Sequence, residues 1–105
     1  MVARVTLAEI DTLRIDIETA VQRFREVILP PLREQPGYRG VYAMSTPEGR
    51  ALVITFWESE EAADAGLASG FYAGQLEAFV TFYRSPPGRE LYDVVVAELP
   101  ERAGV

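Results

Sequence analysis

The stretch YRGVYAMSTPEGRALVITFWE, residues 38–58, gives the strongest indication of the fold. Two runs rich in β-branched and aromatic residues, Tyr38–Ser45 and Ala51–Glu58, flank the sequence Thr46-Pro47-Glu48-Gly49. Proline and glycine at these positions suit a tight turn, so the segment predicts an antiparallel hairpin. Residues 51–57 are apolar almost throughout, which is typical of a strand that is buried on both faces. In the first strand, alternation would place Tyr38 and Tyr42 on one face and Arg39 on the other.

The residues before the hairpin predict a strand and an amphipathic helix. Val2–Ile10 is rich in β-branched and apolar residues and predicts a strand. Asp16 is a favourable N-cap, and apolar residues then recur at the three- and four-residue spacing of a helix: Ile17, Val21, Phe24, Ile28 and Leu32. Pro30 and Pro31 interrupt this stripe, so we expect a kink or a tighter turn near Leu29.

The residues after the hairpin predict a second helix and a last strand. Ser59 is a favourable N-cap for an alanine-rich helix that Gly70 interrupts. A further helical piece carries four residues along one face: Tyr72, Leu76, Phe79 and Tyr83. Leu91–Leu99 predicts the final strand.

The predicted order is β-α-β-β-α-β in a single domain, residues 1–105. This is the split βαβ, ferredoxin-like α+β arrangement, with an antiparallel four-stranded sheet and two helices on one face. The helices leave the other face of the sheet bare, although several strands are apolar on both faces. We therefore expect a homodimer in which the two sheet faces cover each other.

The composition excludes several classes of chemistry. The 105 residues include no Cys, no His and no Lys, so disulfides, thiolate nucleophiles, imidazole bases and Schiff bases are absent. The net charge of −6 would repel a phosphate backbone, which argues against a nucleic-acid partner. There is no apolar run long enough to cross a membrane and no leader, so we expect a cytoplasmic protein. No metal site or cofactor motif is evident.

The segments Pro36-Gly37-Tyr38-Arg39-Gly40-Val41 and Leu52–Ala62 resemble the antibiotic biosynthesis monooxygenase family of the dimeric α+β barrel superfamily. The resemblance implies a homodimer with a barrel made of two facing sheets, and a pocket in each subunit between its sheet and helices. It also implies oxygenation of hydroxyaromatic or quinol-type compounds by molecular oxygen, without metal or flavin. Haem-degrading relatives use a histidine ligand on a helix, and this chain has none.

The candidate site residues follow from the remaining chemical repertoire of phenol, indole, guanidinium and carboxylate. As catalytic residues we predict Trp57 and Tyr72, which could hydrogen-bond a substrate oxygen, and Arg39, which could stabilise an oxyanion. The predicted substrate-binding residues are Tyr42, Phe79, Tyr83 and Asp93. Each has a structural alternative: the aromatic residues suit a hydrophobic core, Arg39 suits a surface ion pair, and Asp93 suits an exposed position.

Two functions therefore remain open. One is a cofactor-independent monooxygenase, in which a deprotonated hydroxyaromatic passes an electron to oxygen. The other is a non-catalytic homodimer, which either binds a small ligand or is a stress-related domain of unassigned function. An isomerase-like role on a small carbonyl compound would instead recruit Asp93 or Glu58 as a base.

Overall fold

The computed structural model describes residues 1–68, 70, 83 and 88–98. Four strands form one sheet in the order β2-β3-β1-β4, and every neighbouring pair is antiparallel. Their bounds are Val2–Glu9 (β1), Tyr38–Ser45 (β2), Arg50–Trp57 (β3) and Gly88–Asp93 (β4). The first and last strands in the sequence therefore lie side by side, as in a ferredoxin-like fold. The predicted α+β class and the hairpin are confirmed.

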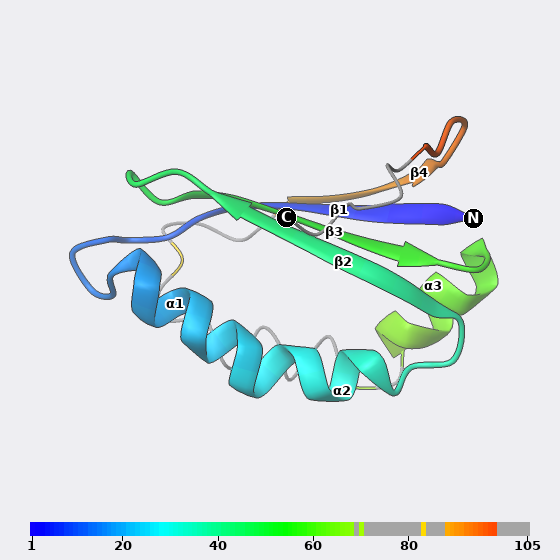
Figure 1. Ribbon diagram of the computed structural model, residues 1–105, viewed down its shortest axis with the longest axis horizontal. Helices are drawn as coiled ribbons and strands as arrows, with labels where there is room; N and C mark the ends of the chain where they lie inside the picture. The colour runs from blue at the N-terminus through cyan, green and yellow to red at the C-terminus, as the bar shows by residue number, and fades with distance from the viewer. Residues whose placement is uncertain (69, 71–82, 84–87, 99–105) are drawn as a thin grey trace.

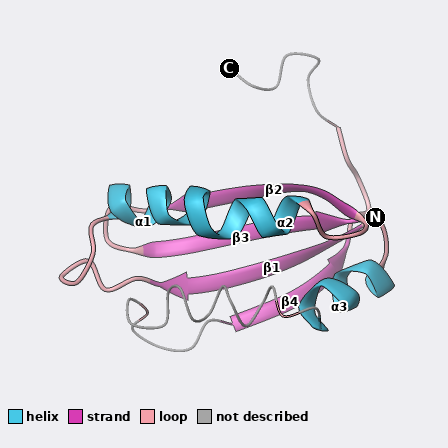
Figure 2. Cartoon of the chain, turned by 90° about the horizontal axis from the view of Figure 1, so that it is seen from below, coloured by secondary structure: helices cyan, strands magenta, loops and turns pink. Residues whose placement is uncertain are grey.

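The described helices all lie on one side of the sheet (Figures 1 and 2). Ile17–Arg23 (α1), Phe24–Ile28 (a π-helical turn, η1) and Leu29–Arg33 (α2) follow one another without a break. Glu60–Ala68 (α3) lies near the edge of the sheet that β4 forms (Figure 2). Both expected caps are present: Asp16 accepts a hydrogen bond from the Thr19 amide, and Ser59 accepts one from the Ala62 amide.

The two prolines produce a wider turn instead of the expected kink or tighter turn. The amide of Leu29 donates to the Phe24 carbonyl five residues earlier, which defines the π-turn. In a regular α-helix the rings of Pro30 and Pro31 would clash with carbonyls four residues before them, and both residues lack a donor. Widening the preceding turn relieves this crowding, so the helix continues to Arg33.

A β-bulge changes the expected alternation in β2. The register with β3 shifts between Tyr38 and Gly40, where Gly40 has a φ of 141°. As a result Tyr38 packs edge-on against Trp57 on the helix side, with 6.1 Å between ring centroids. Tyr42 packs edge-on against Phe56 on the opposite side, at 6.0 Å. The prediction that Tyr38 and Tyr42 share a face is wrong, because a bulge reverses the alternation.

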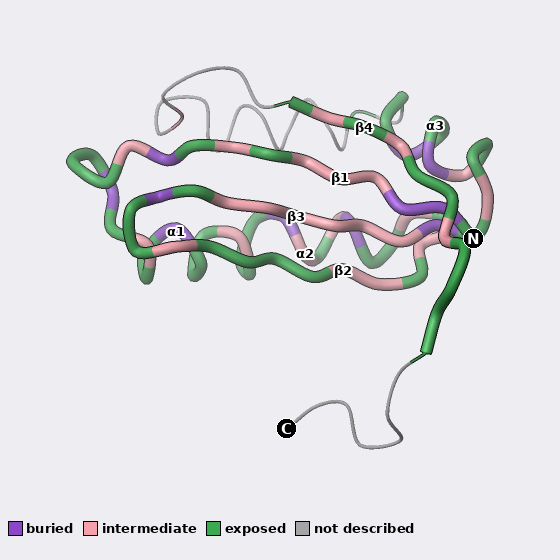
Figure 3. The backbone as a smooth tube through the Cα atoms, turned by 90° about the horizontal axis from the view of Figure 1, so that it is seen from above, coloured by how far each residue is buried: buried purple, intermediate pink, exposed green. Residues whose placement is uncertain are grey.

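The final strand is displaced from its predicted position. The prediction was Leu91–Leu99, whereas β4 runs from Gly88 to Asp93. Residues 94–98 continue without strand pairing and lead away from the sheet, and Val95 and Val96 are largely exposed (Figure 3). Exposed valines explain the difference, because their β propensity reflects packing that this segment lacks within one chain.

The core consists of two clusters between the sheet and the helices. One cluster contains Ile10, Ile15, Ala20 and Ile28, and the other contains Val2, Leu32, Trp57 and Ala63. Among the described residues no polar or charged residue is fully buried. No helix in the described part of the chain is long and apolar enough to span a membrane.

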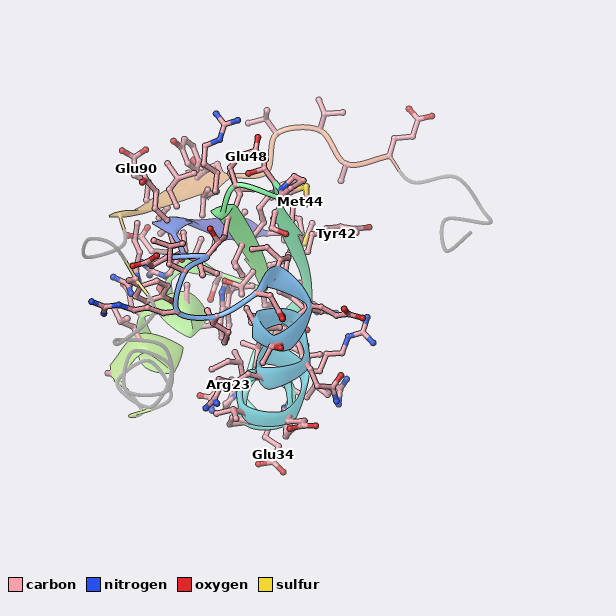
Figure 4. The ribbon with its side chains drawn as sticks, turned by 90° about the vertical axis from the view of Figure 1, so that its left-hand side faces the viewer. Arg23, Glu34, Tyr42, Met44, Glu48 and Glu90 are labelled. Atoms are coloured by element: carbon pink, nitrogen blue, oxygen red, sulfur yellow. The ribbon has the colours of Figure 1, made fainter. Side chains whose placement is uncertain are left out.

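The face of the sheet opposite the helices is uncovered in the single chain (Figure 3) and carries several apolar side chains. Leu7, Tyr42, Met44 and Tyr92 are each about half exposed there. Ile54 lies among them, because it pairs with both Val5 and Tyr42. Figure 4 shows Tyr42 and Met44 on the side away from the helix that carries Arg23 and Glu34. We call this surface the open face.

Gly66 makes room for the indole of Trp57. A Cβ atom at position 66 would lie 2.8 Å from Cη2 of that ring. We expect Gly66→Ala to lower the free energy of unfolding by about 1–3 kcal/mol through overpacking, partly offset by the better helix propensity of alanine. Urea denaturation followed by Trp57 fluorescence measures this. Gly88→Ala, where an added Cβ meets open space, is the matched control and should be close to neutral. Equal stability of the two variants would contradict the packing argument.

Candidate functional site

A pocket of about 80 Å³ lies between the helix-covered face of the sheet and the first helix. Three strands and the first helix contribute residues to it, and its surface is almost entirely apolar. The wall is formed by Thr6, Ala8, Ile10, Ala20, Phe24, Ala43, Met44, Ser45, Ala51, Val53 and Tyr83. A mostly apolar pocket with a few polar groups is the usual form of a small-molecule site.

Small side chains create this pocket. Alanines at positions 8, 20, 43 and 51 line it from β1, α1, β2 and β3. Larger residues at those positions would fill the space between Phe24 and the sheet. The end of β2 from Ala43 to Ser45 is exposed, so the pocket opens to solvent there. Its size and open mouth suit the insertion of one ring of an aromatic compound.

Tyr83 places a phenol in the pocket wall. It pairs with Ile10 through an isolated β-bridge, which brings residue 83 to the end of β1. Burial raises the pKa of the Tyr83 phenol above its ordinary value of 10.0, because the phenolate loses hydration. Tyr83 is therefore protonated at neutral pH. A protonated phenol can donate a hydrogen bond to an oxygen of a bound molecule.

The raised pKa of Tyr83 predicts a loss of stability in alkali. Below pH 10 the phenol is protonated in both the folded and the unfolded chain. Above pH 10 the unfolded chain releases this proton first, so the free energy of unfolding falls as the pH rises. Urea denaturation between pH 9 and about 11.5 measures the slope. Tyr83→Phe should show a shallower fall than the wild type, and an identical slope would contradict the assignment.

Trp57, predicted as catalytic, lies in the core outside this pocket wall. It is 3% exposed and packs with Val2, Leu32 and Ala63. Its indole N–H donates to the Thr55 hydroxyl at 2.9 Å. That hydrogen bond satisfies the one donor of the indole, so Trp57 can act on a ligand only if the bond is exchanged.

Arg39 and Tyr42 lie on the open face. They line a second hollow of about 460 Å³, together with Phe56 and residues of the 94–98 segment. Arg39, expected on the face opposite Tyr42, is brought to the same side by the bulge and lies 3.4 Å from Glu58 in an exposed ion pair. Asp93 is exposed at the end of β4.

The predicted residues do not converge on one site among the described residues. Tyr83 lines the pocket beside the helices, whereas Arg39 and Tyr42 line the hollow on the open face. The predicted residues Tyr72 and Phe79 lie outside the described part of the chain.

Several residues of the pocket wall are not among the site residues that the sequence predicts. The sequence places Phe24 in the apolar stripe of the first helix and Val53 in the strand that is apolar on both faces, and both residues line the pocket. Arg4 and Arg89 also lie on the helix-covered face, close to the wall residue Thr6. Simple alternation in β1 indicates this placement for Arg4, because residues 2, 4, 6 and 8 share one face.

The sequence of this chain matches the model of a known protein family. The family model described as antibiotic biosynthesis monooxygenase matches residues 5–74. The chain belongs to this family. The matched region contains most of β1 and all of the first helix, the hairpin and α3. It therefore includes most of the residues that line the pocket.

Solved structures with the same fold include members of the family and proteins of unknown function. NE2512 of Nitrosomonas europaea, a protein of unknown function, has a TM-score of 0.75 and 22% identity, over 94% of this chain and 93% of its own. SnoaB of Streptomyces nogalater, a cofactor-independent oxygenase, has a TM-score of 0.71 and 16% identity, over 95% of this chain and 97% of its own. Rv0793 of Mycobacterium tuberculosis has a TM-score of 0.67 and 18% identity, over 96% of this chain and 97% of its own. At these identities the likeness concerns the fold. No curated protein matches the sequence significantly.

Proposed function

We propose that this antibiotic biosynthesis monooxygenase family member oxygenates a small hydroxyaromatic or quinol-type compound without a cofactor, in the pocket between the sheet and the helices. The observation that carries the proposal is the pocket itself, which is mostly apolar, open at one end and bordered by the half-buried phenol of Tyr83. The family membership and the fold shared with the cofactor-independent oxygenase SnoaB support the reaction class.

The chemistry is consistent with the residues available to this chain. A hydroxyaromatic ring loses a proton to give an anion with carbanion character, and this anion transfers an electron to dioxygen. The two resulting radicals combine into a peroxide at a ring carbon that still carries one hydrogen, and the peroxide anion takes up a proton. Loss of water then leaves a carbonyl, so one oxygen atom stays on the product and the other leaves as water. The substrate supplies all the electrons.

The pocket supports this reaction by its solvent and hydrogen-bonding properties. Apolar walls exclude water, which strengthens electrostatic interactions with a bound anion. The Tyr83 phenol stays protonated and is suited to donate to an oxyanion that develops on the substrate. Acidic substrates of this class need only a modest base, so the absence of histidine is compatible with the proposal.

A second copy of the chain is the proposed cover for the open face. The exposed apolar side chains of β1, β2 and β4 form one continuous surface with Ile54 at its centre. Burying apolar surface contributes about 25 cal/mol per Å², so a large face of this kind favours association. In the barrel formed by two facing sheets, the partner would also occupy the hollow beside Arg39 and Tyr42.

Oxygen uptake tests the proposed activity. Purified protein, stripped of metals with a chelator, is incubated with anthrones, naphthols and hydroquinones in an oxygen-electrode cell. We expect uptake above the spontaneous rate for at least one class. Trp57→Phe removes the indole donor and conserves its aromatic character, and a lower rate in this variant would support a role for Trp57 in the site. No uptake across the panel by an intact dimer would contradict the proposal.

A second candidate function is ligand binding without catalysis. The separation of Trp57, Arg39 and Tyr42 from the pocket wall favours this alternative, because the wall then holds few reactive groups. Retention of a small molecule through purification, combined with no oxygen uptake, would support it.

A further inference from the structure

The helix-covered face of the sheet carries two arginines beside the pocket. Arg4 of β1 lies directly across from Leu91 of β4, and Arg89 lies across from Thr6. The two arginines are thus diagonal neighbours on one face of β1 and β4. Figure 2 shows these two strands side by side. Long side chains at such positions reach each other. The charge of Arg4 lowers the pKa of Arg89, in addition to the larger effect of burial, which agrees with this proximity.

Both guanidinium groups are partly removed from water. The Arg4 side chain is 16% exposed, and Arg89 is half-buried. The ion pair of Arg4 is directed outward, because its Nη2 lies 3.2 Å from Oδ1 of Asp64, which is 63% exposed. The other end of the group, Nε of Arg4, is buried and has no hydrogen-bond partner among the residues that the structure describes. Buried donors are normally satisfied, so this one has hydrogen-bonding capacity that the described residues do not use.

The arginines adjoin the pocket through Thr6. This residue belongs to the pocket wall, pairs with Arg89 and lies two positions after Arg4 on the same face. Among the described wall residues Tyr83 is the one with an ionisable side chain, and Thr6 and Ser45 supply the other polar side chains. The helix-covered face therefore combines an apolar compartment with a cationic end.

We propose that Arg4 and Arg89 make the pocket selective for aromatic anions, binding a phenolate, enolate or ring carboxylate oxygen at the Thr6 end. Guanidinium groups recognise oxyanions through charge-assisted hydrogen bonds, and two of them side by side favour an anion that separates their charges. The proposal rests on the pocket being the substrate site of the proposed function. It adds that the anionic form of the substrate is the one bound.

Binding of a matched pair of ligands tests this inference without turnover. 4-Hydroxybenzoate and 4-hydroxybenzamide have nearly the same shape and differ in charge. Isothermal titration calorimetry at low salt should show the benzoate binding at least about tenfold more tightly to the wild type, as expected for charged hydrogen bonds. Arg4→Gln and Arg89→Gln should each remove most of this preference and leave binding of the amide within about twofold.

Two further variants separate ligand binding from a structural role of the arginines. Asp64→Asn removes the carboxylate that partly neutralises Arg4, so the preference for the benzoate should rise, by up to about fivefold for an exposed pair. Arg39→Gln, on the open face, changes the net charge as Arg4→Gln does and should leave the preference unchanged. If the arginines served only to hold α3 on the sheet, Arg4→Gln and Asp64→Asn would lower the urea midpoint and neither would alter the preference.

The inference and the proposed function fail in different ways. Equal binding of the two ligands by the wild type, or no binding of either, would overturn the anion site even if oxygen uptake is observed. A preference that depends on Arg4 and Arg89 in a protein without oxygen uptake would support the anion site and contradict the oxygenase.

Discussion

Replacing Ile54 with glutamate is expected to dissociate the proposed dimer into monomers. Ile54 lies at the centre of the open face, between Val5 and Tyr42. An uncompensated buried charge costs about 3–5 kcal/mol, and a symmetric dimer would bury two copies. The dissociation constant should therefore rise by at least about a hundredfold. Light scattering coupled to size-exclusion chromatography at micromolar concentration should show the wild type at twice the 11.7 kDa chain mass and the variant near that mass.

Leu13→Glu is the matched control for this prediction. Leu13 is 91% exposed in the turn before α1 and lies outside the sheet, so the same change of charge there should leave the dimer intact. A wild-type protein that is monomeric at these concentrations, or an Ile54→Glu variant that remains dimeric, would contradict the facing-sheet arrangement.

Replacing Ala43 with phenylalanine is expected to abolish most of the oxygen uptake. Ala43 lines the pocket and is exposed at its mouth, so a larger side chain there can enter the pocket without displacing the core. A phenyl ring would occupy a pocket of about 80 Å³ and compete with the substrate ring. We expect kcat/KM to fall by at least about a hundredfold, which corresponds to about 2.7 kcal/mol of lost transition-state stabilisation.

Ala65→Phe controls for the added aromatic surface. Ala65 is exposed on α3 and does not line the pocket, so its replacement should leave the rate within about twofold of the wild type. Unchanged turnover in Ala43→Phe, with a circular dichroism spectrum like that of the wild type, would place the reaction elsewhere on the protein.

The sequence predicts most of the fold, because local patterns decide it. The hairpin follows from apolar runs around Thr46-Pro47-Glu48-Gly49, and the helix starts follow from Asp16 and Ser59. The π-turn before Pro30 could not be predicted in the same way. Its form depends on how a helix accommodates two adjacent prolines while it stays packed on the sheet.

The candidate site is less accessible to sequence reasoning, because it depends on side-chain direction. One bulge between Tyr38 and Gly40 moves Tyr42 and Arg39 to the open face. The hydrogen bond from the Trp57 indole to the Thr55 hydroxyl likewise cannot be predicted from the sequence. The pocket exists because small side chains leave space between the sheet and the helix. Alanines at scattered positions of the sequence form no motif that would predict it. Arg4 is an exception, since alternation in β1 alone places it on the face of Val2 and Thr6.

Incubation with isotopically heavy dioxygen, followed by mass spectrometry of the product, shows whether the protein oxygenates a substrate in the pocket. Metal-stripped wild-type protein and Ala43→Phe are compared on the most reactive compound of the hydroxyaromatic panel. We expect a product that carries one heavy oxygen atom, formed by the wild type well above the spontaneous rate and by Ala43→Phe close to that rate. A product formed equally fast by both proteins, or no product above the spontaneous rate, would contradict a cofactor-independent oxygenase acting in this pocket.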